Sequence, residues 1–318
     1  MNIKKILVSS AAGALMLGAT IVPAFAATYS TNFETFPPGT IHAQDGWSSL
    51  GAAGLGCAVY DHEVDNSSGY ATFGLQSLRI SNAVTSGCFG DHTFSRSLVN
   101  EAGETSAMGD GMSGGVRQTH FEAQWEFAST VPGSEQPGLS VVASPDRGDG
   151  ARMSWVQMAD TAGGLAVNFY DYQTAVGDFV LTPVATGLDR TVPHTIKITM
   201  DFVDGAANDI VKVYVDGVLE HTGTSWEDYF REVEVNPTRT VDSILFRTGG
   251  AAAPATSGYG FLVDNLSLNS GLSVTPTPTP VLVGPPTNKD QCKKDGWMTF
   301  NNPTFKNQGQ CVSYTNKN

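Results

Sequence analysis

Acidic residues that share one face of a predicted strand are the first candidates for chemistry. Hydrolysis of a glycosidic bond uses two carboxyl groups, about 5 Å apart in enzymes that retain the anomeric configuration. Glu122 and Glu126 lie on the same side of the alternating segment HFEAQWEF, but four residues of strand span about 13 Å. Glu227, Asp228 and Glu232 have the wrong spacing and fall in a segment with a helical pattern. We therefore predict no catalytic pair and expect Glu122 to contact solvent or a ligand.

Residues of the types used by polysaccharide lyases are spread over the predicted strands. A lyase removes a proton with His or Tyr and neutralises a uronate with Arg or Gln. The strand residues of these types are Arg79, His120, Gln124, Arg152, Gln157, Tyr170, Tyr172 and Arg247. No lyase motif joins them. The simpler interpretation is that they are polar residues on water-exposed strand faces.

The same residues favour a glycan-binding face more than a catalytic site. Sugars are held by aromatic platforms with planar amide and carboxylate partners. Trp155 and Gln157 share one side of a predicted strand, as do Asn168, Tyr170 and Tyr172, because side chains alternate along a strand. Trp155 belongs either to this face or to the core. The predicted ligand-binding residues are Arg79, His120, Glu122, Gln124, Arg152, Trp155, Gln157, Tyr170, Tyr172 and Arg247.

The elements that must position these side chains are short strands. Apolar and polar residues alternate in HFEAQWEF, TIKITMDF and IVKVYVDG, and DSILFRTG and YGFLVDNLSL also have the composition of strands. Asp216-Gly217 predicts a tight hairpin turn. One helical segment is predicted over Ser225–Glu234, with Ser225 as its N-cap. Residues 28–270 are therefore predicted to form one all-β, antiparallel sandwich.

The N-terminus has the pattern of a signal peptide. Lys4 and Lys5 precede an apolar run that ends in the small-residue motif AFA, which is typical of a secretory leader with its cleavage site. We predict that residues 1–27 form this leader. The mature protein is then expected to be secreted or associated with the cell envelope, without a membrane span.

The charge of the chain argues against nucleic acid as a partner. The sequence has 18 basic and 31 acidic residues, for a net charge of -13. Without the two lysines of the leader and the five lysines and two aspartates of the tail, 11 basic and 29 acidic residues remain. Neutralising phosphates requires surfaces rich in Lys and Arg. We therefore expect a monomer whose partner is an extracellular glycan or an envelope polymer.

A proline-rich spacer separates the body from a small tail. The alternating prolines of SVTPTPTPVLVGPP predict an extended linker over residues 271–286. The tail, residues 287–318, is too short to bury a stable core without a covalent staple. Its five lysines favour a basic attachment to an anionic envelope polymer, and docking onto the acidic body is the alternative.

The four cysteines all follow the predicted leader, where the compartment is oxidising. An even number of cysteines in an exported chain favours disulfides over metal sites. Three pairings are open. The pairing of Cys57 with Cys88 and of Cys292 with Cys311 is favoured, because the linker separates the two couples.

Several segments resemble known folds and families. VKVYVDGVLEHTG and GYGFLVDNLSL resemble strands of the concanavalin A-like jelly roll, the fold of legume lectins, laminin-G domains and many polysaccharide-acting enzymes. SLRISNAVTSGCFGDHTFS, QPGLSVVASPDRGDGARMSW and VDSILFRTGGAAAPATSGYGFLVDN resemble a family of secreted bacterial proteins with no assigned activity. The tail is similar to a two-cysteine segment that recurs behind such bodies.

The resemblance carries two further implications. Laminarinase-like jelly rolls place their carboxylates in a Glu-x-Asp-x-x-Glu string, and this chain has no such string. Jelly rolls often hold one structural Ca²⁺ where the first and last strands meet. Glu34 and Asp264 are the candidates for that site here, since Ca²⁺ prefers carboxylate oxygens.

Three functions remain open from the sequence. The first is a binding protein for a carbohydrate or another extracellular polymer. The second is a polysaccharide lyase or glycoside hydrolase with a non-standard site. The third is a structural surface protein that is attached by its tail.

Overall fold

The computed structural model describes most of the chain after residue 24. The described stretches are residues 25–49, 61–67, 69–84, 92–109, 115–273, 284–294, 296–300 and 302–316. The chain divides into two compact units between Ser273 and Val274. None of the helices in these stretches is long and apolar enough to span a membrane. Residues 1–24 of the predicted leader and the predicted Cys57–Cys88 bridge lie outside the described residues.

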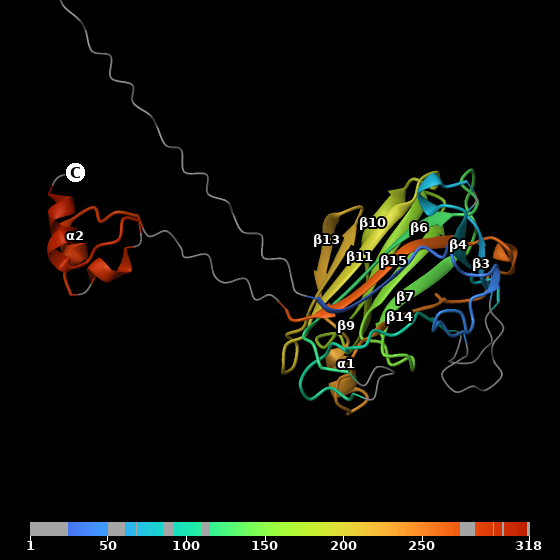
Figure 1. Ribbon diagram of the computed structural model, residues 1–318, viewed down its shortest axis with the longest axis horizontal. Coiled ribbons are helices and arrows are strands. Elements are labelled where there is room, and N and C mark those ends of the chain that lie inside the picture. The colour runs from blue at the N-terminus through green and yellow to red at the C-terminus, as the bar shows by residue number, and fades with distance from the viewer. Residues whose placement is uncertain are drawn as a thin grey trace, which may run out of the picture. The chain divides into compact units, whose positions relative to one another are not determined.

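The first unit is a sandwich of two sheets in which every paired strand is antiparallel (Figure 1). The larger sheet has the spatial order β13-β12-β11-β6-β15-β4-β3-β2, and β1 also pairs with β15. Its strands are β1 (Phe25–Thr31), β2 (Gly39–Thr40), β3 (His62–Asn66), β4 (Gln76–Ile80), β6 (His120–Ser129), β11 (His194–Asp201), β12 (Ile210–Val215), β13 (Val218–Gly223) and β15 (Phe261–Gly271).

The smaller sheet has the spatial order β10-β9-β8-β7-β14-β5. Its strands are β5 (His92–Phe94), β7 (Ser140–Asp146), β8 (Trp155–Thr161), β9 (Gly164–Gln173), β10 (Asp178–Leu188) and β14 (Ser243–Thr248). The chain passes between the sheets several times, so that β6 and β15 pair although they are distant in sequence. This arrangement confirms the predicted all-β jelly-roll sandwich.

The core lies between the two sheets and explains the alternating sequence pattern. Phe121, Trp125 and Phe127 of β6 are fully buried, and Phe246 of β14 meets the Trp125 ring edge-to-face at 6.1 Å across the sandwich. Burying each side chain of this size contributes about 1.5–3 kcal/mol to folding. The polar residues that alternate with them therefore point to the outer face of their sheet, where a site can form.

The connections around β12 and β13 confirm one local prediction and correct another. Asp216 and Gly217 both have positive φ, at 51° and 79°, as a two-residue hairpin turn requires. The predicted helix is present as the short α1 (Glu227–Glu232). Two 3-10 turns occur in other connections of this unit, at Ala71–Phe73 and Pro254–Thr256. The N-cap position of α1 is held by Trp226 and not by Ser225 as predicted. The Ser225 hydroxyl still accepts from the Glu227 backbone N–H at 3.1 Å, and it donates a 2.5 Å hydrogen bond to the buried Asp209.

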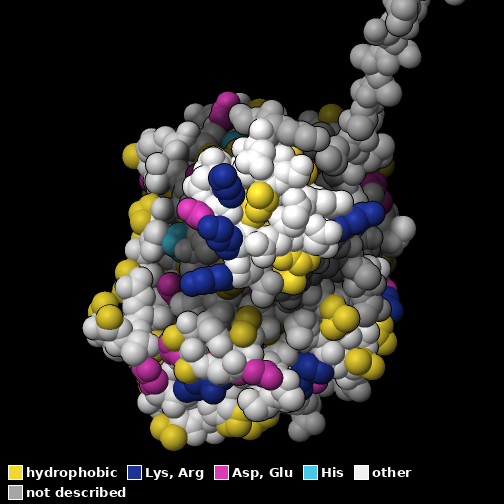
Figure 2. Space-filling model, turned by 90° about the vertical axis from the view of Figure 1, so that its left-hand side faces the viewer, with side chains coloured by type: hydrophobic (Ala, Val, Ile, Leu, Met, Phe, Trp, Pro, Cys, Tyr) yellow, Lys and Arg dark blue, Asp and Glu magenta, His cyan; other side chains and the backbone are white. Residues whose placement is uncertain are grey.

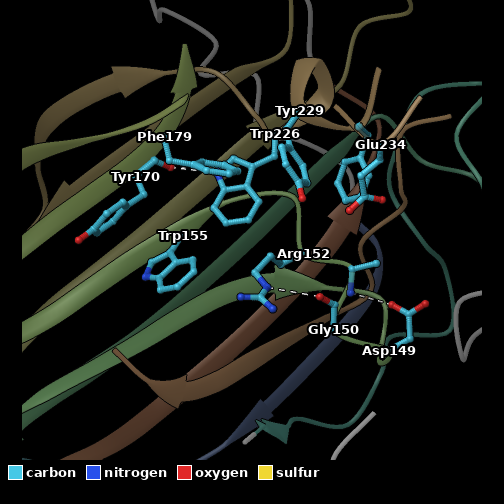
Figure 3. Close-up of a pocket in the computed structure, with 11 residues that line it drawn as sticks. Asp149, Gly150, Arg152, Trp155, Tyr170, Phe179, Trp226, Tyr229 and Glu234 are labelled. Carbon is cyan, nitrogen blue, oxygen red and sulfur yellow. Dashed lines mark hydrogen bonds between the residues drawn. The ribbon is translucent and has the colours of Figure 1, made fainter. Parts of the chain in front are cut away.

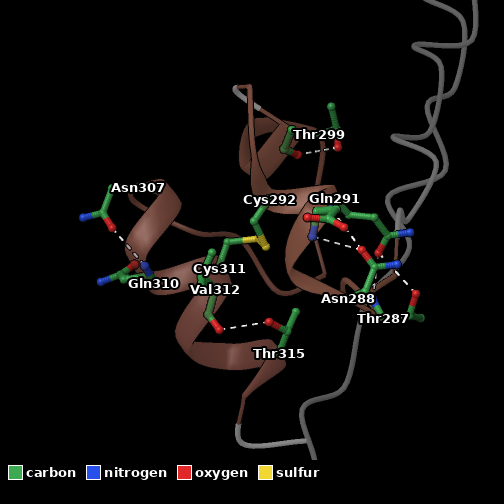
Figure 4. Close-up of a disulfide and its surroundings, with 12 residues drawn as sticks. Thr287, Asn288, Gln291, Cys292, Thr299, Asn307, Gln310, Cys311, Val312 and Thr315 are labelled. Atoms are coloured by element: carbon green, nitrogen blue, oxygen red, sulfur yellow. Dashed lines mark hydrogen bonds between the residues drawn. A yellow bond between two sulfur atoms is a disulfide. The ribbon is translucent and has the colours of Figure 1, made fainter.

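The second unit is small and closed by a disulfide (Figure 4). The 3-10 turns Lys289–Cys292 and Gly296–Thr299 and the helix α2 (Gln308–Thr315) surround the predicted Cys292–Cys311 bridge, which is confirmed. The two cysteines and Phe300 are its buried core. Side chains of Asn288 and Asn307 cap the first turn and α2.

The tail unit exposes its basic side chains to solvent. The exposed lysines are Lys289, Lys293, Lys294 and Lys306. Lys and Arg side chains are dark blue in Figure 2. Only Lys293 forms an ion pair among the described residues of this unit, with Asp290 at 2.6 Å. The tail therefore presents positive charge that its own fold does not neutralise.

Candidate functional site

The structure divides the predicted ligand-binding residues between two separate surfaces. Arg79, His120, Glu122 and Gln124 belong to strands of the larger sheet, where their neighbours in sequence are buried in the core. The remaining six are carried by the smaller sheet and its connections: Arg152, Trp155, Gln157, Tyr170, Tyr172 and Arg247. One groove containing all ten residues is therefore excluded.

Arg79 on the larger sheet forms ion pairs with carboxylates of the same unit. Its guanidinium lies 2.7 Å from Asp61, 3.3 Å from Asp65 and 3.5 Å from Glu63. Burial would lower the pKa of Arg79, but its hydrogen bond to Asp61 and the three carboxylates raise it above its ordinary value. With only 5% of its surface exposed, Arg79 is a structural cation that ties β3 to β4.

The predicted residues of β6 are also engaged by neighbouring strands. His120 Nδ1 lies 2.7 Å from Asp201 Oδ1 of β11. Glu122 lies 3.8 Å from Lys197, whose ammonium group sits 4.6 Å from the centre of the Tyr214 ring. Gln124 is half-buried and pairs in register with Lys197. This face thus carries ion pairs between strands at the predicted residues.

The smaller sheet carries a hollow lined by aromatic side chains (Figure 3). Trp155 of β8 and Tyr170 of β9 are direct cross-strand partners, so their rings lie side by side on the outer face, with centroids 5.4 Å apart. The cavity has a volume of about 490 Å³. Its lining residues are Asp149, Gly150, Ala151, Arg152, Trp155, Tyr170, Phe179, Trp226, Tyr229, Phe230 and Glu234.

The second wall of the cavity comes from Phe179 on the edge strand β10 of the same sheet, and from α1 with the residue before it. Trp226 packs 4.3 Å from Phe179 and 5.8 Å from Trp155, measured between ring centroids. Its indole N–H donates to the carbonyl oxygen of Tyr170 at 3.0 Å, which fixes the ring against β9 (Figure 3). Tyr229 lies 5.0 Å from Phe179 and completes the wall. Each such aromatic pair adds about 0.5–1.5 kcal/mol beyond burial of its area, so this wall is rigid.

Two arginines approach the same indole. The guanidinium carbons of Arg152 and Arg247 each lie 5.4 Å from the centre of the Trp155 ring, within range of a cation–π interaction. Burial, with the positive charge of Arg247 beside it, lowers the pKa of Arg152 to about 10. Arg152 lies in the connection between β7 and β8 and not on a strand as predicted, because Gly148 and Gly150 turn the chain there with positive φ.

Amide side chains extend the outer face beyond the cavity. Gln157 donates to Ser140 Oγ at 2.7 Å and accepts from Asn168 Nδ2 at 3.1 Å. This network fixes the orientation of both amides on neighbouring strands. Tyr172 lies further along β9, where it is 5% exposed and packs against Phe179 and Tyr229. Tyr172 thus packs against two residues of the aromatic wall and is not itself one of the lining residues.

Four aromatic lining residues were not predicted: Phe179, Trp226, Tyr229 and Phe230. The last three belong to SWEDYF, for which the sequence predicted only a helix. The usable signal was the spacing of Trp226, Tyr229 and Phe230, which places three aromatic rings on adjacent positions of a helical turn. Burial and the nearby charge of Glu234 raise the pKa of Tyr229 above its ordinary value, so its hydroxyl stays a hydrogen-bond donor.

The predicted calcium residues, Glu34 and Asp264, lie close together on the larger sheet. Asp264 is fully buried, and its two oxygens accept hydrogen bonds from Ser77 Oγ at 2.9 Å and from the Asn265 amide at 2.6 Å. Burial raises its pKa to about 7, and the charge of Glu34 adds to the shift. Glu34 itself accepts two backbone N–H groups through one oxygen. The pair fits a cation chemically, and calcium there stays a prediction.

Comparison with solved structures finds similarity at low identity. A laminarinase from Rhodothermus marinus matches with a TM-score of 0.44 and 12% identity, covering 79% of this chain and 100% of that one. An endo-β-1,4-glucuronan lyase from the fungus Trichoderma reesei gives 0.40 and 13%, covering 78% and 96%. The carbohydrate-binding module CBM66 from Bacillus subtilis gives 0.35 and 13%, covering 71% and 96%.

No protein-family model and no curated protein matches the chain. At the identities and TM-scores of the solved structures, neither an activity nor a ligand carries over from them to this chain. The predicted membership of a secreted bacterial family stays a prediction. The function must therefore be argued from the cavity itself.

Proposed function

We propose that the first unit binds an extracellular polysaccharide in the aromatic cavity of its smaller sheet. The single observation that carries this proposal is the lining of that cavity: Trp155, Tyr170, Phe179 and Tyr229 are only partly buried around a hollow of about 490 Å³. Flat aromatic faces pack against the C–H faces of sugar rings. Mostly apolar hollows with a few fixed polar groups are typical of binding sites.

Two arginines near the cavity favour a ligand that carries carboxylates. Arg152 lines the cavity together with Asp149 and Glu234, and Arg247 adds a second positive charge beside Trp155. Burial, together with repulsion by Arg247, lowers the pKa of Arg152. A carboxylate between them would relieve that repulsion and accept paired N–H donors, the geometry in which guanidinium groups bind best. The proposed ligand class is therefore a uronate-containing polysaccharide.

A further donor supports recognition of an oxygen-rich ligand. Trp155 Nε1 is buried and has no hydrogen-bond partner among the described residues. A buried donor left without a partner costs about 1–3 kcal/mol. A shift of the ring that uncovers this N–H would let a sugar hydroxyl accept from it and recover that free energy on binding.

The proposal is tested by affinity electrophoresis and calorimetry of the full chain against soluble uronate polysaccharides and neutral glucans. We expect uronate polymers to bind more tightly than neutral ones. Trp155→Ala and Arg247→Met should each weaken binding at least tenfold, about 1.4 kcal/mol at 25 °C. His120→Ala, on the larger sheet, is the matched control and should bind as the unmodified protein does.

Three results would contradict the proposal. The first is that no polysaccharide of the panel binds. The second is that His120→Ala weakens binding as much as Trp155→Ala does. The third is that the polymer binds equally to all variants. Unsaturated or newly reducing ends in the mixtures would show turnover at the same site and replace the binding role with the lyase or hydrolase alternative.

For the tail unit, we propose attachment to an anionic polymer of the cell envelope after secretion. The four exposed lysines on a fold closed by its own disulfide support this role, and a disulfide suits an oxidising compartment. Deleting residues 285–318 should move the protein from the envelope fraction to the medium. Unchanged partitioning of the shortened chain would contradict it.

A further inference from the structure

Three carboxylates meet inside the first unit at a place that the proposed polysaccharide site does not use. Glu104, Asp209 and Glu227 each offer an oxygen, and these oxygens all lie within 4.8 Å of one another. Their exposed fractions are 2%, 5% and 0%. They come from three separate segments: the chain after β5, the connection between β11 and β12, and the first residue of α1.

The protein supplies donors to only part of this cluster. Asp209 accepts from the Val203 amide and from Ser225 Oγ. One oxygen of Glu227 accepts two backbone N–H groups, at 2.8 and 2.9 Å. One oxygen of Glu104 accepts from Arg231 and from a backbone amide.

Two oxygens of the cluster remain without a donor. Glu104 Oε1 and Glu227 Oε2 are buried and have no hydrogen-bond partner among the described residues. Glu227 Oε2 forms an ion pair with Arg231 Nε at 3.8 Å. This distance is too long for a hydrogen bond. A buried carboxylate oxygen without a donor is costly, so it points to a cation that fills the place of the missing donor.

The charge of the cluster defines what would satisfy it. Three carboxylates face one guanidinium, that of Arg231, so with all three ionised two negative charges remain in a buried place. A divalent cation balances them. The ligands are all oxygen atoms, without His or Cys, and oxygens bound to one Ca²⁺ ion by bonds of about 2.4 Å lie at most about 4.8 Å apart, a limit that the cluster meets. We infer that Glu104, Asp209 and Glu227 form a calcium-binding site.

This site is separate from the calcium site predicted at Glu34 and Asp264. It would join α1 to the β5–β6 and β11–β12 connections, and α1 together with the residue before it carries Trp226, Tyr229 and Phe230 of the aromatic wall. Bound Ca²⁺ would therefore hold α1 in place. The inference does not depend on what the cavity binds, because its evidence is confined to the carboxylate cluster.

The test compares calcium binding by the full chain and by charge-neutral variants. Chelated protein is titrated with CaCl₂ by calorimetry, and its melting temperature is followed in parallel. Glu227→Gln and Glu104→Gln should each weaken Ca²⁺ binding at this site at least tenfold. Asp264→Asn, in the other acidic pair, is the control and should leave this binding event unchanged.

The melting temperatures of the variants, with and without Ca²⁺, give a second test of the site. Removing one of three like charges should leave the metal-free variants as stable as the chelated unmodified protein or more so, with a smaller rise of melting temperature on adding Ca²⁺. Normal Ca²⁺ affinity in both Gln variants would overturn the inference. Loss of all binding in Asp264→Asn would overturn it too, because the bound ion would then belong to the other pair.

A second measurement needs no change to the ligands. Tb³⁺ binds to calcium sites and emits when a nearby tryptophan is excited, and Trp226 directly precedes Glu227. We expect sensitised emission from the unmodified chain that Ca²⁺ displaces and that Trp226→Phe reduces at least twofold. Absence of sensitised emission, or emission unchanged in Trp226→Phe, would contradict the proposed site.

Discussion

Asp146, at the end of β7, holds the loop that brings Arg152 to the aromatic cavity. One of its oxygens accepts the backbone N–H groups of Gly148, Asp149 and Gly150 at 2.6, 3.0 and 3.1 Å. The other oxygen is buried with no hydrogen-bond partner among the described residues. Burial raises the pKa of Asp146 to about 6 from an ordinary value of 3.8.

Asp146→Asn should change how stability depends on pH. Because the folded-state pKa is raised, the folded protein binds more protons than the unfolded chain between about pH 4 and pH 6. This group thus favours folding at low pH, and that contribution is lost as the pH rises through 6. A shift of two pKa units corresponds to roughly 3 kcal/mol. The free energy of unfolding of Asp146→Asn, relative to the unmodified protein, should rise by roughly 2–3 kcal/mol between pH 4 and pH 8.

Urea denaturation of both proteins at pH 4, 6 and 8, in chelator, measures this difference. Other titrating groups cancel, because they are common to the two proteins. Glu220→Gln is the control, since that side chain is exposed on β13 and meets water in both states. A difference between Asp146→Asn and the unmodified protein that stays constant over this range would refute the argument that burial of this carboxylate is costly.

Three further predictions concern the framework of the site. Arg79→Met should lower the free energy of unfolding by about 3 kcal/mol, measured in urea, because the partly buried Asp61 loses its cation, while the exposed Glu63 and Asp65 add little. Gly260→Ala should cost about 3 kcal/mol by the same assay, since its φ is +105° and an added Cβ would lie 2.1 Å from the Ile80 carbonyl oxygen. Replacing Cys292 and Cys311 by Ser should remove about 3 kcal/mol of loop closure over a separation of 19 residues. In that variant, hydrogen exchange should lose protection in the tail and keep it in β6, and retained protection in the tail would contradict the estimate.

The fold was accessible from the sequence because strand periodicity is a local signal. In β6 and β11 the apolar residues alternate with polar ones, and the structure buries the first set and turns the second outward. The hairpin at Asp216-Gly217 also depended only on local backbone preferences. The predicted Cys292–Cys311 bridge followed from the linker that separates the two couples of cysteines, and the small size of the tail indicated the need for such a staple.

The composition of the site was accessible only in part, because it depends on which sheet each strand joins. Trp155, Tyr170 and Arg247 come together since β8 pairs with β9 and both share a sheet with β14. Arg79 and His120 have equally suitable side chains, but β4 and β6 belong to the other sheet. Sequence periodicity assigns a residue to a face of its strand and carries no information about the partner sheet.

The aromatic wall was missed for a related reason. Trp226 and Tyr229 lie about 55 residues from Tyr170 along the chain, and packing of α1 against β9 brings them together. The spacing of the carboxylates in the same segment predicted only that they form no catalytic pair. The structure instead directs Glu227 inward to Glu104 and Asp209.

The central claim is that the aromatic cavity holds the polysaccharide, and the indole N–H signals of the five tryptophans test it most directly. A ¹⁵N-labelled full chain is titrated with a uronate oligosaccharide while these signals are followed by NMR. We expect the signals of Trp155 and Trp226, which line the cavity, to shift. The signals of Trp47 and Trp125, which are buried in the core, and of Trp297 in the tail should stay in place. A saturating shift of Trp297 alone, or binding that moves none of the five signals, would contradict the claim.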